Sequence, residues 1–285
     1  MTAVTEYNLF TVMDYCADMR RCRSLLRGGS RSFYAASLLL PGYYRAPATA
    51  LYAFCRVADD EVDLRGRPVR TLASLRERLY RVYQERPIND SVDRMLANVV
   101  ARFDIPVELP EALLEGFEWD FDGRHYLDES DIYAYSARVA GTVGAMTAML
   151  MGVRDPVVMA RACDLGVAMQ LTNIARDVGE DARAGRLYLP YRWMQDAGLD
   201  PERWLAEPAH GPELAVVVQR LLHRAERLYD RSAEGIASLP LACRPAMFAA
   251  RSIYREIGRE LERRGLDSVN QRTVVSHRRK VGLLA

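Results

Sequence analysis

The sequence lacks the cysteine patterns that build disulfide frameworks or zinc sites, and it has almost no lysine. Its five cysteines are odd in number and contain no C-x-x-C pair, which argues for a reducing, cytoplasmic setting. Of its 39 basic residues only Lys280 is a lysine. Arginine suits phosphate binding, but arginine used this uniformly is better explained by genome composition than by function.

The sequence also has no pattern typical of a signal peptide, a membrane-spanning helix or a nucleic-acid-binding surface. The N-terminal residues have no basic region followed by an apolar run, so we expect no signal peptide. The longest uncharged run, residues 139–153, has 15 residues, fewer than the roughly 20 that cross a bilayer. A net charge of +1 gives no reason to expect a nucleic-acid partner. Peripheral contact with the inner face of a membrane is left open, as is the oligomeric state.

Strand-like alternation is nearly absent, and apolar residues recur at helical spacing from end to end. The sequence therefore predicts an all-α protein of roughly ten helices. Neither a Gly/Ser linker nor a low-complexity tract divides it, so we expect a single domain over residues 1–285. Residues 184–213 contain four prolines and three glycines and are predicted to form an ordered loop with short helices.

What the sequence does contain is two acidic motifs on predicted helices. In QLTNIARDVGED, residues 170–181, Asn173, Asp177 and Asp181 are spaced by four, so a helix places them on one face about a turn apart. Like charges at that spacing repel each other. A cation between the carboxylates would explain the pattern.

A second segment, LYAFCRVADDEVD at residues 51–63, repeats the arrangement. Asp59 and Asp63 are four residues apart, and Tyr52 and Arg56 lie on the same stripe. One such pair usually marks a solvated helix face, but two pairs on apolar helices that we expect to be largely buried indicate a function. Buried carboxylates are protonated, paired with arginine or bound to a metal.

Magnesium fits these residues best because it prefers oxygen ligands and takes one or two carboxylates together with substrate phosphates. The four histidines are scattered and do not suggest zinc. Asn173 can add a neutral oxygen, and Arg56, Arg176 and Arg186 can bind phosphate oxygens. With neither a Walker loop nor G-x-G-x-x-G, a nucleotide is not the expected ligand.

A diphosphate held by metal ions in an apolar helical cavity suits the ionisation of an allylic diphosphate, because apolar walls shield a carbocation from water. The segment VAGTVGAMTAML, residues 139–150, can supply such a wall. Gly141 and Gly144 in it would let neighbouring groups approach closely, or would serve tight helix packing.

Four blocks in chain order resemble the signatures of the squalene and phytoene synthase family, most closely those of its bacterial phytoene synthase branch. They are GSRSFYAASLLLP (29–41), LYAFCRVADDEVD (51–63), RVAGTVGAM (138–146) and QLTNIARDVGEDARAGRLYLP (170–190). The resemblance implies an isoprenoid synthase fold with helices around a central cavity. It also implies a prenyltransferase that needs Mg²⁺ or Mn²⁺, with no NADPH expected, and joins two geranylgeranyl diphosphates head to head to phytoene through prephytoene diphosphate.

The resemblance also assigns residues. The two aspartate motifs, with Asn173, are the implied metal ligands: Asp59, Asp63, Asp177 and Asp181. Tyr52 and Arg56 join the four aspartates as implied catalytic residues. The implied substrate contacts come from every block and from the C-terminal region: Ser30, Phe33, Gln170, Asn173, Arg176, Arg186, Tyr188, Tyr254, Arg278, Arg279 and Lys280. Where many members have Tyr-x-Val-Ala-Gly, this chain has Ala137, so no tyrosine role is carried over to that position.

Alternatives remain beside this expectation. Asp59-Asp60-x-x-Asp63 also satisfies the D-D-x-x-D pattern of chain-elongating prenyltransferases and terpene cyclases, but the second block argues against them. A squalene-type or dehydrosqualene-type synthase using farnesyl diphosphate is the nearest alternative. A non-catalytic relative acting in complex assembly fits poorly, because both aspartate pairs are intact.

The N-terminal signature bears on chain length. If RSFYAAS is helical, Ser37 lies one turn beyond Phe33, about 5.4 Å along the axis, which is comparable to one isoprene unit. Ala35, Ala36 and Ser37 are small, so this face either leaves room for a C20 tail or allows close helix packing.

Overall fold

The protein is helical throughout the part of the chain that the structure describes. The structure is a computed structural model that describes residues 12–64 and 68–283. In those residues the chain forms fourteen α-helices and one π-helix, with no strand. The all-α prediction is confirmed. The expected number of helices was too low because α2, α10, α11 and α14 have only six or seven residues each.

Residue contacts group the chain into two compact units, Met1–Val107 and Glu108–Ala285, and each is described by itself. The single domain over residues 1–285 stays a prediction. Unit 1 contains α1 (Val12–Gly29), α2 (Arg31–Ser37), α3 (Gly42–Leu64), α4 (Pro68–Tyr83) and α5 (Ser91–Phe103).

Unit 1 is held together by an apolar core and by buried ion pairs between its helices. Helix α3 packs against α1, α4 and α5. Arg78 of α4 donates to the buried Asp93 of α5 at 2.6 and 2.9 Å, and Arg94 of α5 donates to the buried Asp18 of α1 at 2.6 and 2.8 Å. Removing one partner of such a pair would leave a buried charge uncompensated, so these contacts fix how the helices pair.

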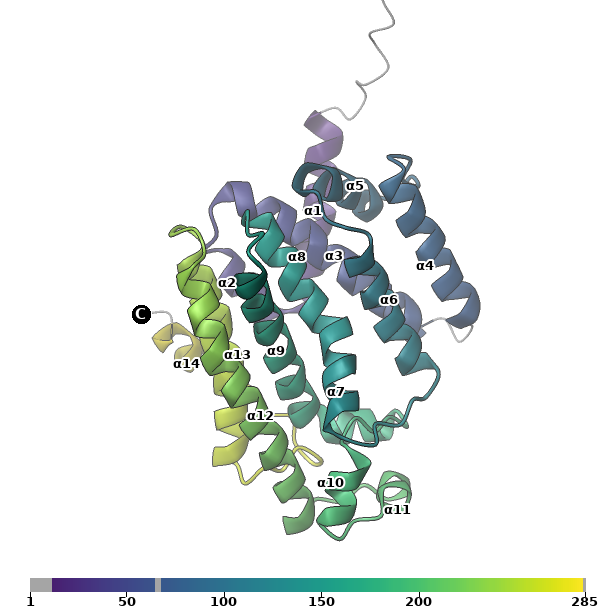
Figure 1. Cartoon of the computed structure of the whole chain (residues 1–285), viewed down its shortest axis with the longest axis vertical. Helices are drawn as coiled ribbons and strands as arrows, with labels where there is room; N and C mark the ends of the chain where they lie inside the picture. The colour runs from purple at the N-terminus through teal and green to yellow at the C-terminus, as the bar shows by residue number, and fades with distance from the viewer. Residues whose placement is uncertain (1–11, 65–67, 284–285) are drawn as a thin grey trace, which may run out of the picture. The chain divides into compact units, whose positions relative to one another are not determined.

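Unit 2 is built around the 28-residue helix α9. Its elements are α6 (Glu108–Phe121), α7 (Glu129–Ser136), the π-helix η1 (Ala137–Gly141), α8 (Thr142–Leu150), α9 (Pro156–Arg183), α10 (Tyr191–Asp196), α11 (Pro201–Ala206), α12 (Pro212–Ala237), α13 (Arg244–Arg263) and α14 (His277–Gly282). Helix α9 packs against α7, η1, α8, α12 and α13, and Figure 1 shows it among these helices. Short helices α10 and α11 confirm the prediction for residues 184–213.

Two glycines let α9 approach the η1–α8 segment closely. A Cβ atom added at Gly144 of α8 would lie 2.3 Å from the backbone oxygen of Ala162, and one at Gly166 of α9 would lie 2.2 Å from that of Ala140. Both distances are shorter than any van der Waals contact. Helix packing thus explains Gly144, whereas Gly141 has only ordinary contacts, the nearest at 3.5 Å from Val167 Cγ2.

Two further findings concern the cysteines and the hydropathy of the helices. All five cysteines are free thiols. Among the described residues, none of the helices combines the length and the apolar character that a membrane crossing needs.

The glycine contacts predict unequal costs for two alanine substitutions. Gly144→Ala should destabilise the protein by about 1–3 kcal/mol, because a methyl group pressed against backbone forces the helices apart. Gly141→Ala, the matched control, should be neutral or slightly stabilising because alanine favours helix. Urea unfolding midpoints measure both, and equal effects would contradict the packing account.

Candidate active site

The second acidic motif lies on the C-terminal half of α9, as predicted. The helix begins where the Asp155 side chain accepts hydrogen bonds from the backbone of Val157 and Val158, with Pro156 in the first turn. It ends before Gly185, whose φ of 74° suits glycine. Between these ends, Asn173, Asp177 and Asp181 are carried on one continuous helix.

Asp177 is paired with two arginines. Its neighbour Arg176 binds it through Nε at 2.8 Å and through Nη2. Arg272, from the segment between α13 and α14, donates to the same carboxylate at 2.9 and 3.3 Å. Asp177 and Arg176 are each only 15% exposed. Burial lowers the pKa of Arg176, but Asp177, with a smaller contribution from Tyr254, raises it above its usual value overall.

Asp181, one turn further along α9, lies in a different environment. Burial, and then the carboxylate of Asp177, raise the pKa of Asp181 to about 7, and Arg186 offsets only part of this. The ionised form of Asp181 is therefore unfavourable beside Asp177 unless additional positive charge is bound nearby. The contribution of Asp177, which is second to burial, is the repulsion that the spacing of four residues predicts.

Asn173 supplies a buried oxygen on the same face. Its Oδ1 has no hydrogen-bond partner among the protein atoms described, while its amide nitrogen makes a long bond of 3.4 Å to Gln170 Oε1. An unpaired buried carbonyl oxygen is unfavourable, and a bound cation would satisfy it.

A short strap of chain, residues 267–273, brings Arg272 to this face. Gly179 N donates to Ser268 O at 3.0 Å, and a Cβ atom at Gly179 would lie 2.2 Å from Val269 O. Arg183 Nη1 also donates to Val269 O at 3.1 Å. The glycine in the motif therefore allows the strap to lie directly on α9.

The first acidic motif lies at the C-terminal end of α3 in unit 1. Arg56 donates to Asp59 at 3.2 Å and to Asp60 at 3.1 Å. The side chains of Asp59 and Asp60 are 42% and 36% exposed, so the expectation that this motif is largely buried was wrong. The motif lies at a helix end, where solvent reaches both carboxylates. The side chain of Asp63 lies outside the described residues.

The N-terminal signature forms α2 and the contacts around it. Ser30 is the N-cap of α2 and accepts a hydrogen bond from Phe33 N at 3.2 Å. The ring of Phe33 contacts that of Tyr52 at 5.9 Å between centroids. A Cβ atom at Gly29 would lie 2.6 Å from Tyr52 Oη and 3.3 Å from Arg56 Cδ, so Gly29 leaves room for both predicted side chains.

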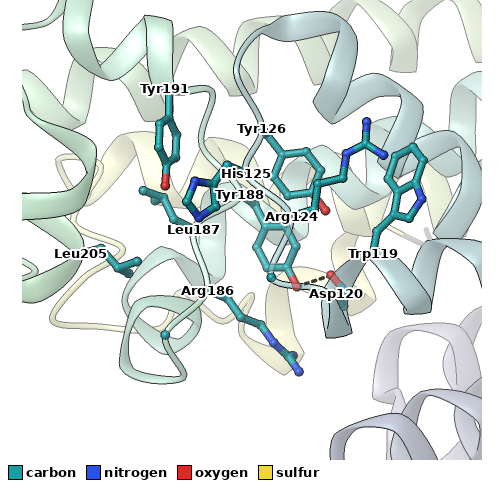
Figure 2. A pocket seen from close by; sticks show the side chains of 12 residues that line it. Trp119, Asp120, Arg124, His125, Tyr126, Arg186, Leu187, Tyr188, Tyr191 and Leu205 are labelled. Atoms are coloured by element: carbon teal, nitrogen blue, oxygen red, sulfur yellow. Dashed lines mark hydrogen bonds between the residues drawn. The ribbon is translucent and has the colours of Figure 1, made fainter. Parts of the chain in front are cut away.

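Arg186 and Tyr188 line a pocket in unit 2 (Figure 2). Tyr188 Oη donates to Asp120 of α6 at 2.7 Å, and Trp119 and Arg124 form part of the wall. The guanidinium of Arg124 lies 3.7 Å from the ring centre of Trp119.

The predicted C-terminal residues lie on α13 and α14. Tyr254 of α13 is buried, whereas Arg278 and Arg279 are exposed and Lys280 is partly exposed. Arg279 Nε donates at 2.8 Å to Glu256, which is 1% exposed and also binds Arg263 at 2.6 Å. Burial raises the pKa of Glu256, but these two arginines hold it below its usual value overall. Arg279 therefore anchors α14 to α13 in this structure.

The residues on α9 fit a divalent cation shared with a phosphate group. No three His, Cys, Asp or Glu side chains gather into a metal cage within the described part of the chain. A pair of carboxylates with one orphaned amide oxygen is the incomplete oxygen set that magnesium completes with water and substrate phosphate.

Three residues of this region were missed by sequence reasoning: Arg272, Asp120 and Tyr135. Each is brought in by a contact distant in sequence; the Arg272 to Asp177 contact spans 95 residues. Tyr135 Oη donates to Asp120 at 2.8 Å. Tyr135 lies two positions before Ala137, the residue because of which no tyrosine role was carried over. Only the run Tyr133-Ala-Tyr135 could have drawn attention to it.

Comparison with known proteins agrees with the four sequence blocks. The squalene/phytoene synthase family matches residues 26–280. The chain belongs to the squalene/phytoene synthase family. The phytoene synthase of Rhodobacter capsulatus is 54% identical over 272 residues, covering 94% of this chain and 80% of the relative. That of Cereibacter sphaeroides is 54% identical over 275 residues, covering 93% and 78%.

Solved structures place the fold in the same family. The crystal structure of a dehydrosqualene synthase in complex with a ligand superposes with a TM-score of 0.87 at 34% identity, covering 95% of both chains. The predicted isoprenoid synthase fold is confirmed.

The environment of Asp181 predicts a pH effect on the metal-free protein. Since its folded pKa of about 7 lies above the usual 3.8, its contribution to stability is full below pH 3.8. That contribution is lost as pH rises through about 7. Asp181→Asn should therefore raise the melting temperature at pH 8 more than at pH 5, measured in EDTA.

Glu262→Gln, which removes an exposed carboxylate outside this site, is the control for a general effect of lost negative charge. If Asp181→Asn gave the same shift at pH 5 and pH 8, the repulsion on α9 would not be as described.

Proposed function

We propose that this chain joins two geranylgeranyl diphosphates head to head, through prephytoene diphosphate, to phytoene in carotenoid biosynthesis. The observation that carries this is the 54% identity to two bacterial phytoene synthases over more than nine tenths of the chain. Each turnover releases two diphosphates and two protons, one lost as prephytoene diphosphate forms and one as the rearranged cation becomes phytoene, and because no step is a net reduction, no NADPH is required.

Asp177, Asp181 and Asn173 are the residues of α9 that would hold Mg²⁺ or Mn²⁺. When bound, the ion stabilises the charge of the departing diphosphate. The raised pKa of Asp181 and the unpaired oxygen of Asn173 support this assignment, since both would be relieved by a cation.

Arg176 and Arg272 bind Asp177 in this structure, and we assign them a second partner in the substrate. A guanidinium forms a bidentate pair with carboxylate or phosphate alike. With a cation at Asp177, both arginines would be able to bind the diphosphate oxygens. We assign Arg186, whose backbone N donates to Asp181 O at 2.9 Å, to the same group.

Unit 1 has a similar combination of aspartates and an arginine at the C-terminal end of α3. Arg56 holds Asp59 and Asp60, and we assign Asp59 and Asp63 to metal binding and Arg56 to phosphate. Tyr52, in contact with Phe33, lies on the same helix stripe. We assign Gln170, Ser30, Phe33, Tyr188, Tyr254, Arg278 and Lys280 to substrate contact as implied by the family.

Product analysis tests this function. The protein should convert C20 diphosphate with Mg²⁺ to a C40 hydrocarbon, and NADPH should change neither rate nor product. C15 diphosphate should be a poorer substrate. Mass spectrometry of the extract identifies the product; a C30 hydrocarbon as the main product, or none from either substrate, would contradict the proposal. A chain-elongating enzyme would instead yield a longer diphosphate from added isopentenyl diphosphate.

A second candidate, dehydrosqualene synthesis from C15 diphosphate, is favoured by the structural match to a dehydrosqualene synthase. That match has 34% identity, against 54% for the phytoene synthases, so we place it second. The two candidate functions differ in the length of the substrate's prenyl tail, and the N-terminal signature bears on that length.

The α2 helix, Arg31–Ser37, carries Phe33 and Ser37 one turn apart, as the sequence predicted. Ser37 is its last residue and its hydroxyl donates to Tyr34 O at 2.8 Å. If this face lines the tail site, Ser37→Phe should shift preference from C20 towards C15 diphosphate, because overpacking excludes the longer tail first.

The measurement is the ratio of kcat/KM for the two substrates, since a folding defect would lower both together. Ser37→Ala, which adds no bulk, serves as control. An unchanged ratio in a folded Ser37→Phe variant would show that Ser37 does not line the tail site.

A further inference from the structure

Glu256 of α13 is a carboxylate that the proposed function does not use, although its charge is among the most deeply buried in the described chain. Its side chain is 1% exposed. Its Oε1 accepts hydrogen bonds from Arg263 Nη2 at 2.6 Å and from Arg279 Nε at 2.8 Å. These two arginines are 50% and 58% exposed. A buried charge is unfavourable unless it is paired, so Glu256 is kept in the interior by two guanidinium groups that reach it from the surface.

The two arginines come from different parts of the chain. Arg263 lies seven residues further along α13, so it braces Glu256 on its own helix. Arg279 lies 23 residues away, in α14, which Figure 1 shows beside α13. Helix α14 has only six residues, too few to be stable without contacts to the rest of the protein. The bond between Arg279 and Glu256 is therefore a main determinant of where α14 lies.

The same bond sets the rotation of α14 about its axis. Successive residues of a helix are about 100° apart around the axis, so with Arg279 turned to α13, Arg278 and Lys280 lie on the two flanks. Lys280 is partly exposed, whereas Arg278 is exposed. Ser276 begins the helix: its Oγ accepts from Arg279 N at 3.3 Å, and its carbonyl oxygen accepts from Lys280 N at 3.0 Å. The direction of the Lys280 side chain thus depends on the anchoring of its neighbour.

The chain on either side of this anchor reaches the acidic face of α9. The strap of residues 267–273, which precedes α14, lies on α9 and carries Arg272 to that face. On α13, Tyr254 lies two residues before Glu256 and contributes to the raised pKa of Arg176. Helix α14 is therefore held by the two segments that border the site to which we assign the diphosphate.

We propose that Glu256 is a positioning residue: through Arg279 it fixes α14 so that the ammonium group of Lys280 is directed to the diphosphate, and Arg279 itself does not contact the substrate. The inference rests on the proposed function, which assigns Lys280 to substrate contact. It replaces the substrate contact that the family resemblance implied for Arg279. A cation on an anchored helix binds an anion more tightly than one on a loose segment, because less conformational freedom is lost on binding.

The sign of one substitution separates positioning from direct contact. If Arg279 bound the diphosphate itself, Glu256 would compete for it, and removing that negative charge would strengthen diphosphate binding. If Glu256 positions α14, the same change loosens the helix and weakens binding. Glu256→Gln removes the charge and keeps the size of the side chain, so the two accounts predict opposite shifts in affinity.

Equilibrium dialysis of radiolabelled inorganic diphosphate with Mg²⁺ measures this affinity without turnover. We expect Glu256→Gln to raise the Kd about tenfold, the fold-change for the loss of one hydrogen bond to a charged group. KM for the C20 diphosphate should rise in proportion while kcat changes little, because a contact made equally in ground and transition states affects KM alone. Lys280→Gln should have the same effect, and the double variant should be little worse than either single one.

Two further variants separate this from a general defect. Glu262→Gln removes an exposed carboxylate from the same helix and should leave the Kd for diphosphate unchanged. Arg279→Gln should weaken binding as Glu256→Gln does, whereas Arg279→Lys, which keeps a positive charge opposite Glu256, should restore part of the loss. Melting temperatures of all variants are measured alongside.

The outcomes distinguish the two levels of the argument. A wild-type protein that makes no C40 product would overturn the proposed function, and one that binds no diphosphate would overturn both. Tighter or unchanged diphosphate binding in Glu256→Gln, or additive losses when it is combined with Lys280→Gln, would overturn the role of Glu256 alone. Should Glu256→Gln fail to fold, the exposed Arg279 decides: Arg279→Gln should add nothing to Lys280→Gln, and additive losses would contradict the proposal.

Discussion

The repulsion between Asp177 and Asp181 is the constraint on which the rest of the site depends. Two carboxylates one turn apart on a packed helix cannot both be ionised without nearby positive charge. The two residues differ in their surroundings: Asp177 is held by Arg176 and Arg272, whereas burial first and then the charge of Asp177 raise the pKa of Asp181 to about 7. We propose that this site receives a cation and, with it, an anionic substrate.

The fold around α9 is arranged to bring those arginines into place. Gly179 lets the strap of residues 267–273 lie on the helix, and the strap carries Arg272 to Asp177. Beyond the strap, Arg279 and Arg263 bind the buried Glu256 and fasten α14 to α13. On the other flank, Gly144 and Gly166 allow the η1–α8 segment to approach α9 backbone to backbone. Helix packing and site geometry thus share the same small residues.

The parts predicted from sequence are those set by local spacing. Asn173, Asp177 and Asp181 share a helix face because helical geometry requires it, and the prolines and glycines after residue 184 indicated the short helices α10 and α11. Contacts distant in sequence could not be read in this way. Arg272, Asp120 and Tyr135 reach the site through folding, and the exposure of Asp59 follows from its place at a helix end. The π-helix η1 was also missed, since an apolar run has the same composition in either helix type.

The central claim is that arginine-paired carboxylates exchange their partners for a metal and a diphosphate together. Equilibrium dialysis with Mn²⁺, with and without inorganic diphosphate, measures this most directly, because the compartment without protein contains the same Mn²⁺–diphosphate complex and only the ion bound to protein is counted. The account predicts weak Mn²⁺ binding alone and binding at least about tenfold tighter with diphosphate, the size of a typical coupling between two ligands. Asp177→Ala should abolish the increase. Equal affinity in the two titrations, or an increase that survives in Asp177→Ala, would contradict it.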